Sequence, residues 1–426
     1  MAAQLSASVR KEVLPSGLTV ITETMPHTHT VAMGVFVAAG SQDETRTQAG
    51  IAHVIEHMLF KGTRRRSAKA LAEAMDAVGG RTNAYTSKEH TLFHANVPAE
   101  RAEFSCDFLS DILLKSRLAA DDLTLEKNVI QEEIKMGEDA ADEYVHELAE
   151  QALWPGQPLG RLIIGSRQSV AALRGQHLRA FMQRYYHPAN LVWAVAGAVQ
   201  HQQVLAWVQK YFTARSRRKP RHRSAVLTQA RPQYLFLKRD TEQANVCLAY
   251  PLSGYHSQRR AVQLVLNGIL GGNMSSRLFQ ELREKRGLAY SVGSYPTHYR
   301  GAGALVLYGG TSPATLEKTL RLMRALAQGL ADKGVSAREL VRAREQLRGS
   351  TYLANESSMA RMIWLGRSEL QFGRHYSVQK FIDEVMQVTR EQVRAEARRI
   401  FASCQPSAAL IGPFEGSSPF KKVIYG

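Results

Sequence analysis

Two histidines and a glutamate stand close together in an otherwise apolar run, GIAHVIEHMLFKGT, at residues 50–63. His53 and His57 are four residues apart, about one helical turn, so a helix would project both imidazoles from the same face. Two neutral imidazoles in that arrangement can supply two ligands of a tetrahedral zinc ion. Glu56 lies about 60° around the helix from His53, where it suits a general base for a bound water better than a ligand.

The plainer interpretation of this run is a core helix that carries two hydrogen-bonded histidines and a surface carboxylate. The flanking sequence argues against it, because a charged residue beside a histidine on the apolar face of a buried helix is costly unless it is paired or ligated. The order His-x-x-Glu-His is the inverted form of the helix motif of zinc peptidases. A zinc site built on these two histidines needs a third protein ligand from elsewhere in the chain.

A pair of glutamates further along the chain meets the need for that ligand. Glu126 and Glu133 are seven residues apart in DDLTLEKNVIQEEIKM, which places them two turns apart on one face of an amphipathic helix. One of them could ligate zinc while the other holds a histidine N–H. The spacing does not say which, and Glu132, about 100° away around the helix, is a further candidate.

Together, these two motifs resemble those of the insulinase and pitrilysin type of inverted zinc peptidase. The closest resemblance, over the whole chain, is to the small-subunit group that includes the mitochondrial processing peptidases and their bacterial relatives. It implies that His53, His57 and Glu133 are the ligands of one zinc ion per chain. It also implies that Glu56 is the base and that Glu126 is the supporting carboxylate.

The stretch from residue 81 to residue 98 alternates like a pair of strands. The resemblance implies that Asn83, Ala84 and Tyr85 lie on an edge strand that pairs with the substrate backbone, as in strand addition. From the residues alone, a plain sheet edge would be the interpretation. His90 and His94 are also four residues apart, but a strand separates them further than a helix does, so we do not expect them to be ligands.

Composition bounds the class of protein. The chain has 426 residues, 44% of them hydrophobic, which is enough for two domains. Its three cysteines have no metal spacing and indicate reduced thiols. The net charge of +17 raises the alternative of a nucleic-acid-binding protein, but part of the excess lies in one run, RSRRKPRHR at residues 215–223, without aromatic residues to stack on bases. We expect a solvated linker there, and nucleic acid as an unlikely partner.

The beginning of the chain has no apolar stretch of the kind found in secretory signals. No run of about 18 apolar residues occurs elsewhere. We therefore expect a soluble, cytoplasmic protein that does not enter a membrane.

The second half of the sequence repeats the first with a period of about 218 residues. The segment NGILGGNMSSRLF is paired with the zinc motif in this comparison, so that Gly272, Ser275 and Ser276 replace the two histidines and the glutamate. The second half is therefore not expected to bind zinc. The predicted division is a zinc-binding catalytic half at residues 1–213, a basic linker at 214–223, and an inactive homologous half at 224–426 that completes the active site.

Arg283 and Tyr290 are the candidate residues by which the second half would complete the active site. They resemble an arginine and tyrosine pair of the family that reaches from the second half to the zinc site. An arginine can hold a substrate carbonyl, and a tyrosine hydroxyl can donate to a developing oxyanion. The plainer interpretation is a surface arginine and a core tyrosine, and Arg286 and Tyr295 are nearby alternatives.

The expected fold class is α+β, with two homologous α/β-sandwich halves, each a mostly antiparallel sheet covered by helices, that face each other across a cleft. The expected function is that of a zinc endopeptidase acting on unfolded peptides, as a homodimer. The alternative is a non-catalytic, peptide-binding partner subunit of a processing peptidase. Such subunits usually lack part of the zinc motif, whereas this chain has all of it.

Overall fold

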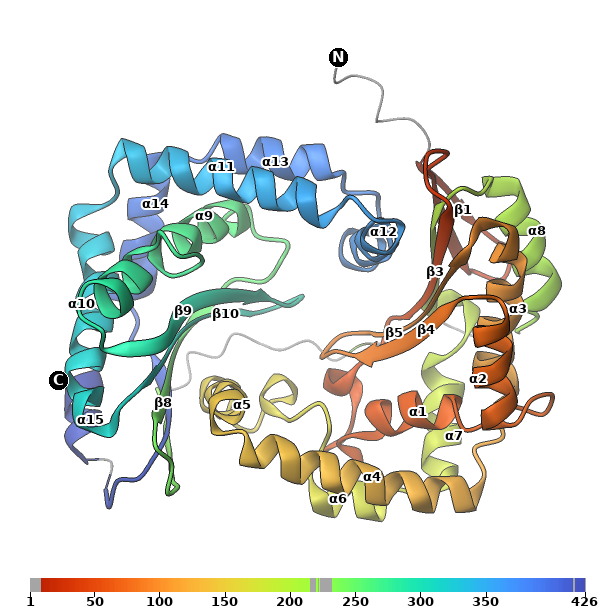
Figure 1. Cartoon of the computed structure of the whole chain (residues 1–426), viewed down its shortest axis with the longest axis horizontal. Helices are drawn as coiled ribbons and strands as arrows, with labels where there is room; N and C mark the ends of the chain where they lie inside the picture. The colour runs from red at the N-terminus through yellow and green to blue at the C-terminus, as the bar shows by residue number, and fades with distance from the viewer. Residues whose placement is uncertain (1–8, 215–219, 221, 223–231, 417, 426) are drawn as a thin grey trace. The chain divides into compact units, whose positions relative to one another are not determined.

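The computed structural model describes residues 9–214, 220, 222, 232–416 and 418–425. They form two compact units, each with one sheet and covering helices (Figure 1). The predicted α+β fold of two similar halves is confirmed. Most of the predicted basic linker, residues 214–223, lies outside the described residues. No described helix is both long enough and apolar enough to cross a membrane.

The first unit is built on a six-stranded sheet with the order β1-β2-β6-β3-β5-β4. Neighbouring strands are antiparallel except β2 and β6, which are parallel. Strands β1 and β2 form a hairpin, and Gly17 supplies the positive φ of 82° in its turn. The strands are β1 (Val9–Val13), β2 (Thr19–Thr24), β3 (Thr30–Val37), β4 (Arg81–Thr86), β5 (Thr91–Pro98) and β6 (Leu191–Gly197).

The two faces of this sheet are covered by different parts of the chain. On one face, apolar side chains of seven helices form a core with β3 and β5. On the other, α12 (Ser358–Phe372) packs against Phe36 and Leu92. The seven helices are α1 (Ile51–Leu59), α2 (Ala68–Ala77), α3 (Ala102–Lys115), α4 (Ala120–Asp139), α6 (Arg167–Ala172), α7 (Gly175–Tyr185) and α8 (His201–Tyr211).

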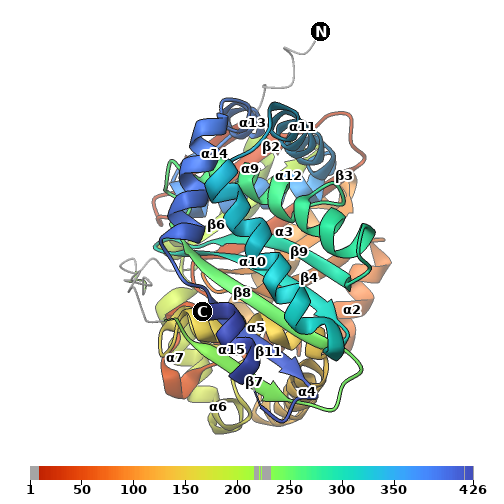
Figure 2. The ribbon, with the colours of Figure 1, turned by 90° about the vertical axis from the view of Figure 1, so that its left-hand side faces the viewer.

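The second unit has a five-stranded sheet with the order β7-β11-β8-β10-β9, in which only β7 and β11 are parallel. Figure 2 shows α10, α14 and α15 in front of its strands. The strands are β7 (Tyr234–Lys238), β8 (Ala244–Leu252), β9 (Ala289–His298), β10 (Gly303–Thr311) and β11 (Ser407–Gly412). The helices are α5 (Ala141–Leu153), α9 (Arg260–Leu270), α10 (Leu316–Lys333), α11 (Ala337–Ala354), α13 (Val378–Met386), α14 (Arg390–Ala397) and α15 (Ser418–Tyr425).

The two sheets repeat one topology. Strands β2, β6, β3, β5 and β4 correspond in order and direction to β7, β11, β8, β10 and β9, which supports the predicted internal repeat. Helix α9 corresponds to α1. In the first unit α1 lies between strand β3 and the edge strands β4 and β5, and in the second unit α9 lies between strand β8 and the edge strands β9 and β10. The predicted pairing of the zinc motif with Gly272, Ser275 and Ser276 is therefore wrong, since these residues lie in the turn after α9.

The boundary between the units does not follow the sequence halves. Residues 135–161, which include α5, belong to the second unit, and residues 353–376, which include α12, belong to the first. The contiguous ranges 1–213 and 224–426 therefore differ from the structural units by two exchanged segments. These segments hold corresponding helices, because α5 follows α4 as α12 follows α11.

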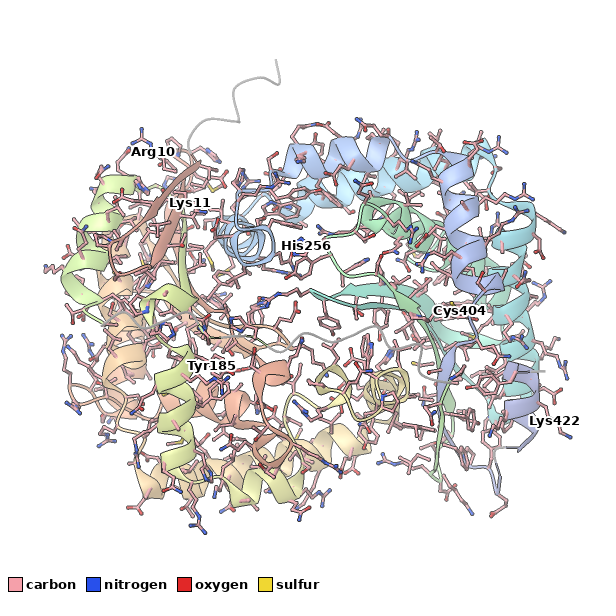
Figure 3. All side chains as sticks on the ribbon, turned by 180° about the vertical axis from the view of Figure 1, so that it is seen from behind. Arg10, Lys11, Tyr185, His256, Cys404 and Lys422 are labelled. Atoms are coloured by element: carbon pink, nitrogen blue, oxygen red, sulfur yellow. The ribbon has the colours of Figure 1, made fainter. Side chains whose placement is uncertain are left out.

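Helix α12 is joined to the first sheet by close packing and ion pairs. The guanidinium of Arg361 contacts the Glu23 carboxylate with an Nε to Oε2 distance of 2.9 Å. Lys11, labelled in Figure 3, donates from β1 to Glu369 at 2.6 Å. At the centre of the contact, Gly366 lies so close to Phe36 that an added Cβ would be 2.0 Å from the ring.

The cysteines are free thiols. Cys106 and Cys247 are buried, whereas Cys404 (Figure 3) is only partly buried.

We predict that Gly366→Ala destabilises the protein although alanine is the better helix former. The new methyl group would overlap the buried Phe36 ring, and such overpacking costs about 1–3 kcal/mol. Gly329→Ala in α10 is the matched control, because nothing lies within 4 Å of its added Cβ, and it should stabilise by up to about 1 kcal/mol. Thermal unfolding of the two variants measures the difference, and an unchanged midpoint for Gly366→Ala would contradict the packing of α12 on this sheet.

Candidate metal centre

Helix α1 begins at a cap supplied by a side chain from the loop that precedes it. Both oxygens of the buried Glu44 carboxylate accept backbone N–H groups there, from Gly50 at 2.8 Å and from Ala52 at 2.9 Å. The Gly50 backbone has a φ of 91°, and an added Cβ would lie 2.4 Å from the carbonyl oxygen of Ile164. These contacts satisfy N–H groups that a helix leaves free at its first turn, and they hold α1 in place.

Burial of α1 is one-sided. Its buried residues, which anchor it in the first core, are Ile51, Ala52, Val54, Ile55, Met58 and Leu59. His53, Glu56 and His57 are left on the partly exposed face, as the helical spacing predicts.

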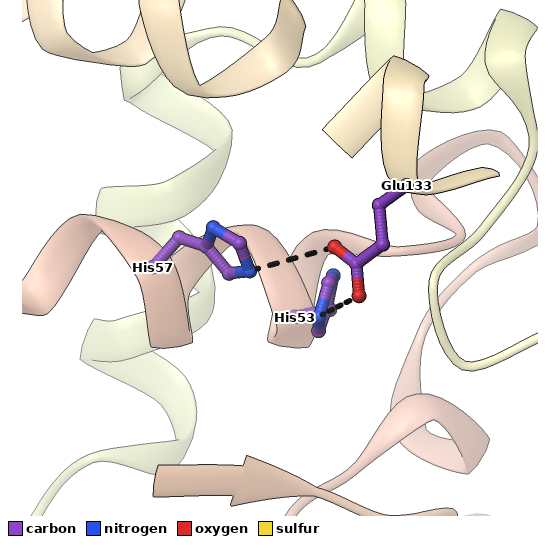
Figure 4. A group of neighbouring side chains, drawn as sticks. All are labelled: His53, His57 and Glu133. Carbon is purple, nitrogen blue, oxygen red and sulfur yellow. Dashed lines mark ion pairs between the residues drawn. The ribbon is translucent and has the colours of Figure 1, made fainter. Parts of the chain in front are cut away.

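The structure brings His53, His57 and Glu133 together (Figure 4). The Nε2 atoms of His53 and His57 each lie 3.8 Å from an oxygen of Glu133, and one potential ligand atom from each of the three residues lies within 4.8 Å of the others. The 3.8 Å separations are too long for hydrogen bonds. The three groups therefore converge without bonding to one another.

The neighbours of these three residues suit a metal ion. The Nδ1 atom of His57 lies 3.0 Å from Glu126, so an N–H there leaves the Nε2 lone pair directed toward Glu133. Lys61 in turn contacts the other oxygen of Glu126 at 2.6 Å. Burial, and next the charge of His57, lower the pKa of His53 to about 4, which keeps His53 neutral near pH 7 as ligation requires. Two imidazole nitrogens and one carboxylate oxygen form a donor set that zinc accepts.

The three candidate glutamates of α4 differ in their exposure and in their position relative to the two histidines. Glu133 converges with the histidines and has a side chain that is 47% exposed. Glu126 is nearly buried and contacts the far side of His57. Glu132 is exposed and is not part of the convergent group. Spacing alone did not separate these positions, because it does not locate α1 relative to α4.

Glu56 lies beside the convergent group and outside it. The Thr86 hydroxyl donates a hydrogen bond to its carboxylate at 2.6 Å. Burial raises the pKa of Glu56 above its ordinary value, and the Thr86 bond acts in the opposite direction. Sequence reasoning missed Thr86, which ends the strand predicted to carry the substrate.

That strand, β4, is the terminal strand of the described sheet. One of its edges pairs with β5, and no described strand pairs with the other edge. The predicted residues occupy its middle. Ala84 is buried in the core beneath α1, Tyr85 packs on the opposite face, and Asn83 is exposed. His90, which follows in the turn, bonds to Tyr85 and Ser87 and takes no part in the convergent group.

Arg283 and Tyr290 lie together in the second unit. Arg283 belongs to a π-helical segment, Phe279–Glu284, and its guanidinium is 4.9 Å from the centre of the Tyr290 ring. Tyr290 is 75% exposed on the terminal strand β9. The alternatives have other partners, since Arg286 pairs with Glu281 and the Tyr295 hydroxyl contacts His146 at 2.8 Å. Of the four residues, Arg283 and Tyr290 form the stacked, accessible pair.

Two protein-family models match the chain. Residues 19–167 match insulinase, peptidase family M16, and residues 172–347 match the M16 inactive domain. The second match agrees with the absence of histidine and glutamate from α9.

Similar proteins cover nearly the whole chain. An uncharacterized zinc protease of Mycobacterium tuberculosis is 40% identical over 95% of this chain and 93% of its own length. The uncharacterized zinc protease YmxG of Bacillus subtilis is 37% identical over 96% of this chain and 100% of its own.

Solved structures show the same fold. A peptidase M16 inactive domain from Pseudomonas fluorescens has a TM-score of 0.89 at 20% identity, covering 96% of this chain and 98% of that one. A protease from Helicobacter pylori has a TM-score of 0.89 at 19% identity, covering 95% and 99%. The chain matches zinc proteases over nearly its whole length, and its His-His-Glu group converges on the inverted motif. This chain therefore belongs to the insulinase family of peptidases, family M16.

Proposed function

We propose that this chain is a zinc-dependent endopeptidase that cleaves unfolded peptides. The observation that carries the proposal is the convergence of His53, His57 and Glu133 next to Glu56, a carboxylate with a raised pKa. Relatives named zinc proteases, similar over 93% and 100% of their own lengths, support the same class of activity.

In this proposal His53, His57 and Glu133 hold the metal. A bound zinc ion would polarise the substrate carbonyl and lower the pKa of an attacking water. Glu126 fixes the ring orientation of His57 through its contact with Nδ1. The salt bridge to Lys61 holds Glu126 in turn, so that the orientation of His57 depends on two side chains in series.

Glu56 is the proposed base. It accepts a proton from the attacking water and returns it to the amine that leaves when the peptide bond breaks. A carboxylate of raised pKa accepts a proton more readily than a solvated one, which is the adjustment that acid–base catalysis needs. The Thr86 hydroxyl occupies one oxygen of the carboxylate and orients the other.

The terminal strand β4 is the proposed binding site for the substrate backbone. An extended peptide added to this edge would form main-chain hydrogen bonds beside Asn83, Ala84 and Tyr85, independently of its sequence. Because Thr86 of the same strand bonds to Glu56, the bound backbone would run close to the base. An unfolded segment meets this requirement, since a folded protein has few free strands.

We propose that Arg283 and Tyr290 complete the site from the second unit. The Arg283 guanidinium would hold a substrate carbonyl, and the Tyr290 hydroxyl would donate to the oxyanion that forms on attack. The cation–π contact between them keeps the arginine close to the ring while the tyrosine remains accessible.

The first test separates the base from the ligands. Glu56→Gln should retain about one zinc per chain and lose peptidase activity, because the amide cannot accept the proton. Zinc content by elemental analysis and peptide cleavage by mass spectrometry give the two readouts, and chelation of the wild-type protein should abolish cleavage until zinc is restored. A zinc-loaded wild-type chain that binds peptides without cutting them would favour the non-catalytic partner subunit instead.

The second test distinguishes the glutamates of α4. Glu133→Gln should lose zinc, and Glu126→Gln should weaken zinc binding by about 10- to 100-fold through His57. Glu132→Gln is the control, because Glu132 is exposed on the same helix and outside the convergent group. Zinc affinity, measured by competition with a chelating dye, decides among them, and loss of zinc in the Glu132 variant would refute the assignment.

The third test concerns the second unit. Tyr290→Phe should reduce kcat by about 10²- to 10³-fold by removing one oxyanion donor, without changing zinc content. Tyr352→Phe is a matched control, as another partly exposed tyrosine of the second unit. Equal kcat values for wild type and Tyr290→Phe would limit the role of Tyr290 to packing.

A further inference from the structure

Helix α12 carries two arginines in very different environments. Arg361 and Arg367 are six residues apart, so they point about 120° apart around the helix. Arg361 faces β2 and forms a nearly buried ion pair with Glu23. Arg367 is exposed, and no hydrogen bond or ion pair joins it to any residue that the structure describes. A positive charge is therefore left available on the flank of α12 away from β2.

Local packing places that charge near the terminal strand β4. Gly366 lies against the Phe36 ring, whose centre is 6.0 Å from that of His90. The Tyr85 hydroxyl of β4 lies 3.2 Å from His90. Burial, and next the charge of Arg367, lower the pKa of His90 to about 3. The Arg367 charge thus acts on the Tyr85–His90 pair at the end of β4.

Side chains of β4 alternate between the two faces of the sheet. Ala84 and Thr86 face α1, where Ala84 joins the core and Thr86 bonds to Glu56. Tyr85 faces α12, with Phe36 and Leu92. A peptide strand added to β4 would alternate in the same way. Every second side chain of the peptide would therefore lie on the face that carries Arg367.

We propose that Arg367 selects substrates with an acidic side chain at one of these alternate positions. This inference rests on the proposed function and names its substrate class, peptides with a glutamate or aspartate near the cleaved bond. A guanidinium with no partner can form two parallel hydrogen bonds to a carboxylate. The net charge of +17 would also favour the approach of acidic peptides.

The test compares peptides that differ only by glutamate or glutamine. Glutamate is placed in turn at each position around a cleavage site of the wild-type protein, and cleavage is followed by mass spectrometry. We expect kcat/KM to rise about three- to tenfold at one or more alternate positions. The gain should lie in KM, and it should shrink with added salt because the arginine is exposed.

Charge reversal tests the residue. Arg367→Glu should abolish or invert the preference for glutamate, measured as the ratio of kcat/KM for the glutamate and glutamine peptides. Arg101→Glu, the same change at an exposed arginine at the start of α3, should retain the preference. A glutamate preference that survives in Arg367→Glu, or that is absent from the wild type, would overturn the inference.

Binding separates this inference from the proposed function. Fluorescently labelled peptides are titrated into Glu56→Gln protein, with and without Arg367→Glu, and followed by anisotropy. If the wild-type chain cuts the glutamate and glutamine peptides equally, and the Glu56→Gln protein binds them equally, only the role of Arg367 is overturned. Tighter binding of the glutamate peptide that depends on Arg367, without cleavage by the wild type, supports Arg367 and overturns the endopeptidase.

Discussion

The candidate metal centre depends on the one-sided burial of helix α1. Its apolar residues fill the first core, and the Glu44 carboxylate caps its first turn. Rotation of this helix would remove Ile51 or Ile55 from the core, so the partly exposed face is held in one orientation. The two imidazoles and the Glu56 carboxylate are presented on that face. Their separation therefore follows from packing that involves none of the three groups.

A second set of contacts joins the centre to the rest of the first unit. Glu133 and Glu126 arrive on α4, whose buried face is held by Ile130 and Ile134 in the same core. Thr86 arrives on β4, in antiparallel register with β5. Helix α4 thus places two carboxylates against α1, and strand β4 places one hydroxyl there. Such a site rests on rigid elements, which suits a reaction that needs fixed distances.

The repeat has diverged in chemistry while retaining its topology. Both sheets have five corresponding strands in the same order, but α9 has an apolar sequence where α1 has the zinc motif. The exchange of α5 and α12 between the repeats gives each unit a helix from the other half of the sequence. In the first unit this helix covers a sheet face that would otherwise expose Phe36 and Leu92, and it also brings Arg367 toward β4. A segment far along the chain therefore shapes the surroundings of the predicted substrate strand.

The sequence by itself related His53, Glu56 and His57 of the candidate centre and predicted the helices and the strand that carry its residues. Helical spacing related His53, Glu56 and His57, because those distances are local, and hydrophobic alternation indicated the strands. It could not decide among Glu126, Glu132 and Glu133, since that choice depends on the position of α4 against α1. It also missed Thr86 and the exchange of α5 with α12. Only the tertiary structure decided these features, because contacts between distant segments depend on how whole elements pack, and an amphipathic helix does not encode in its own pattern which sheet it will cover.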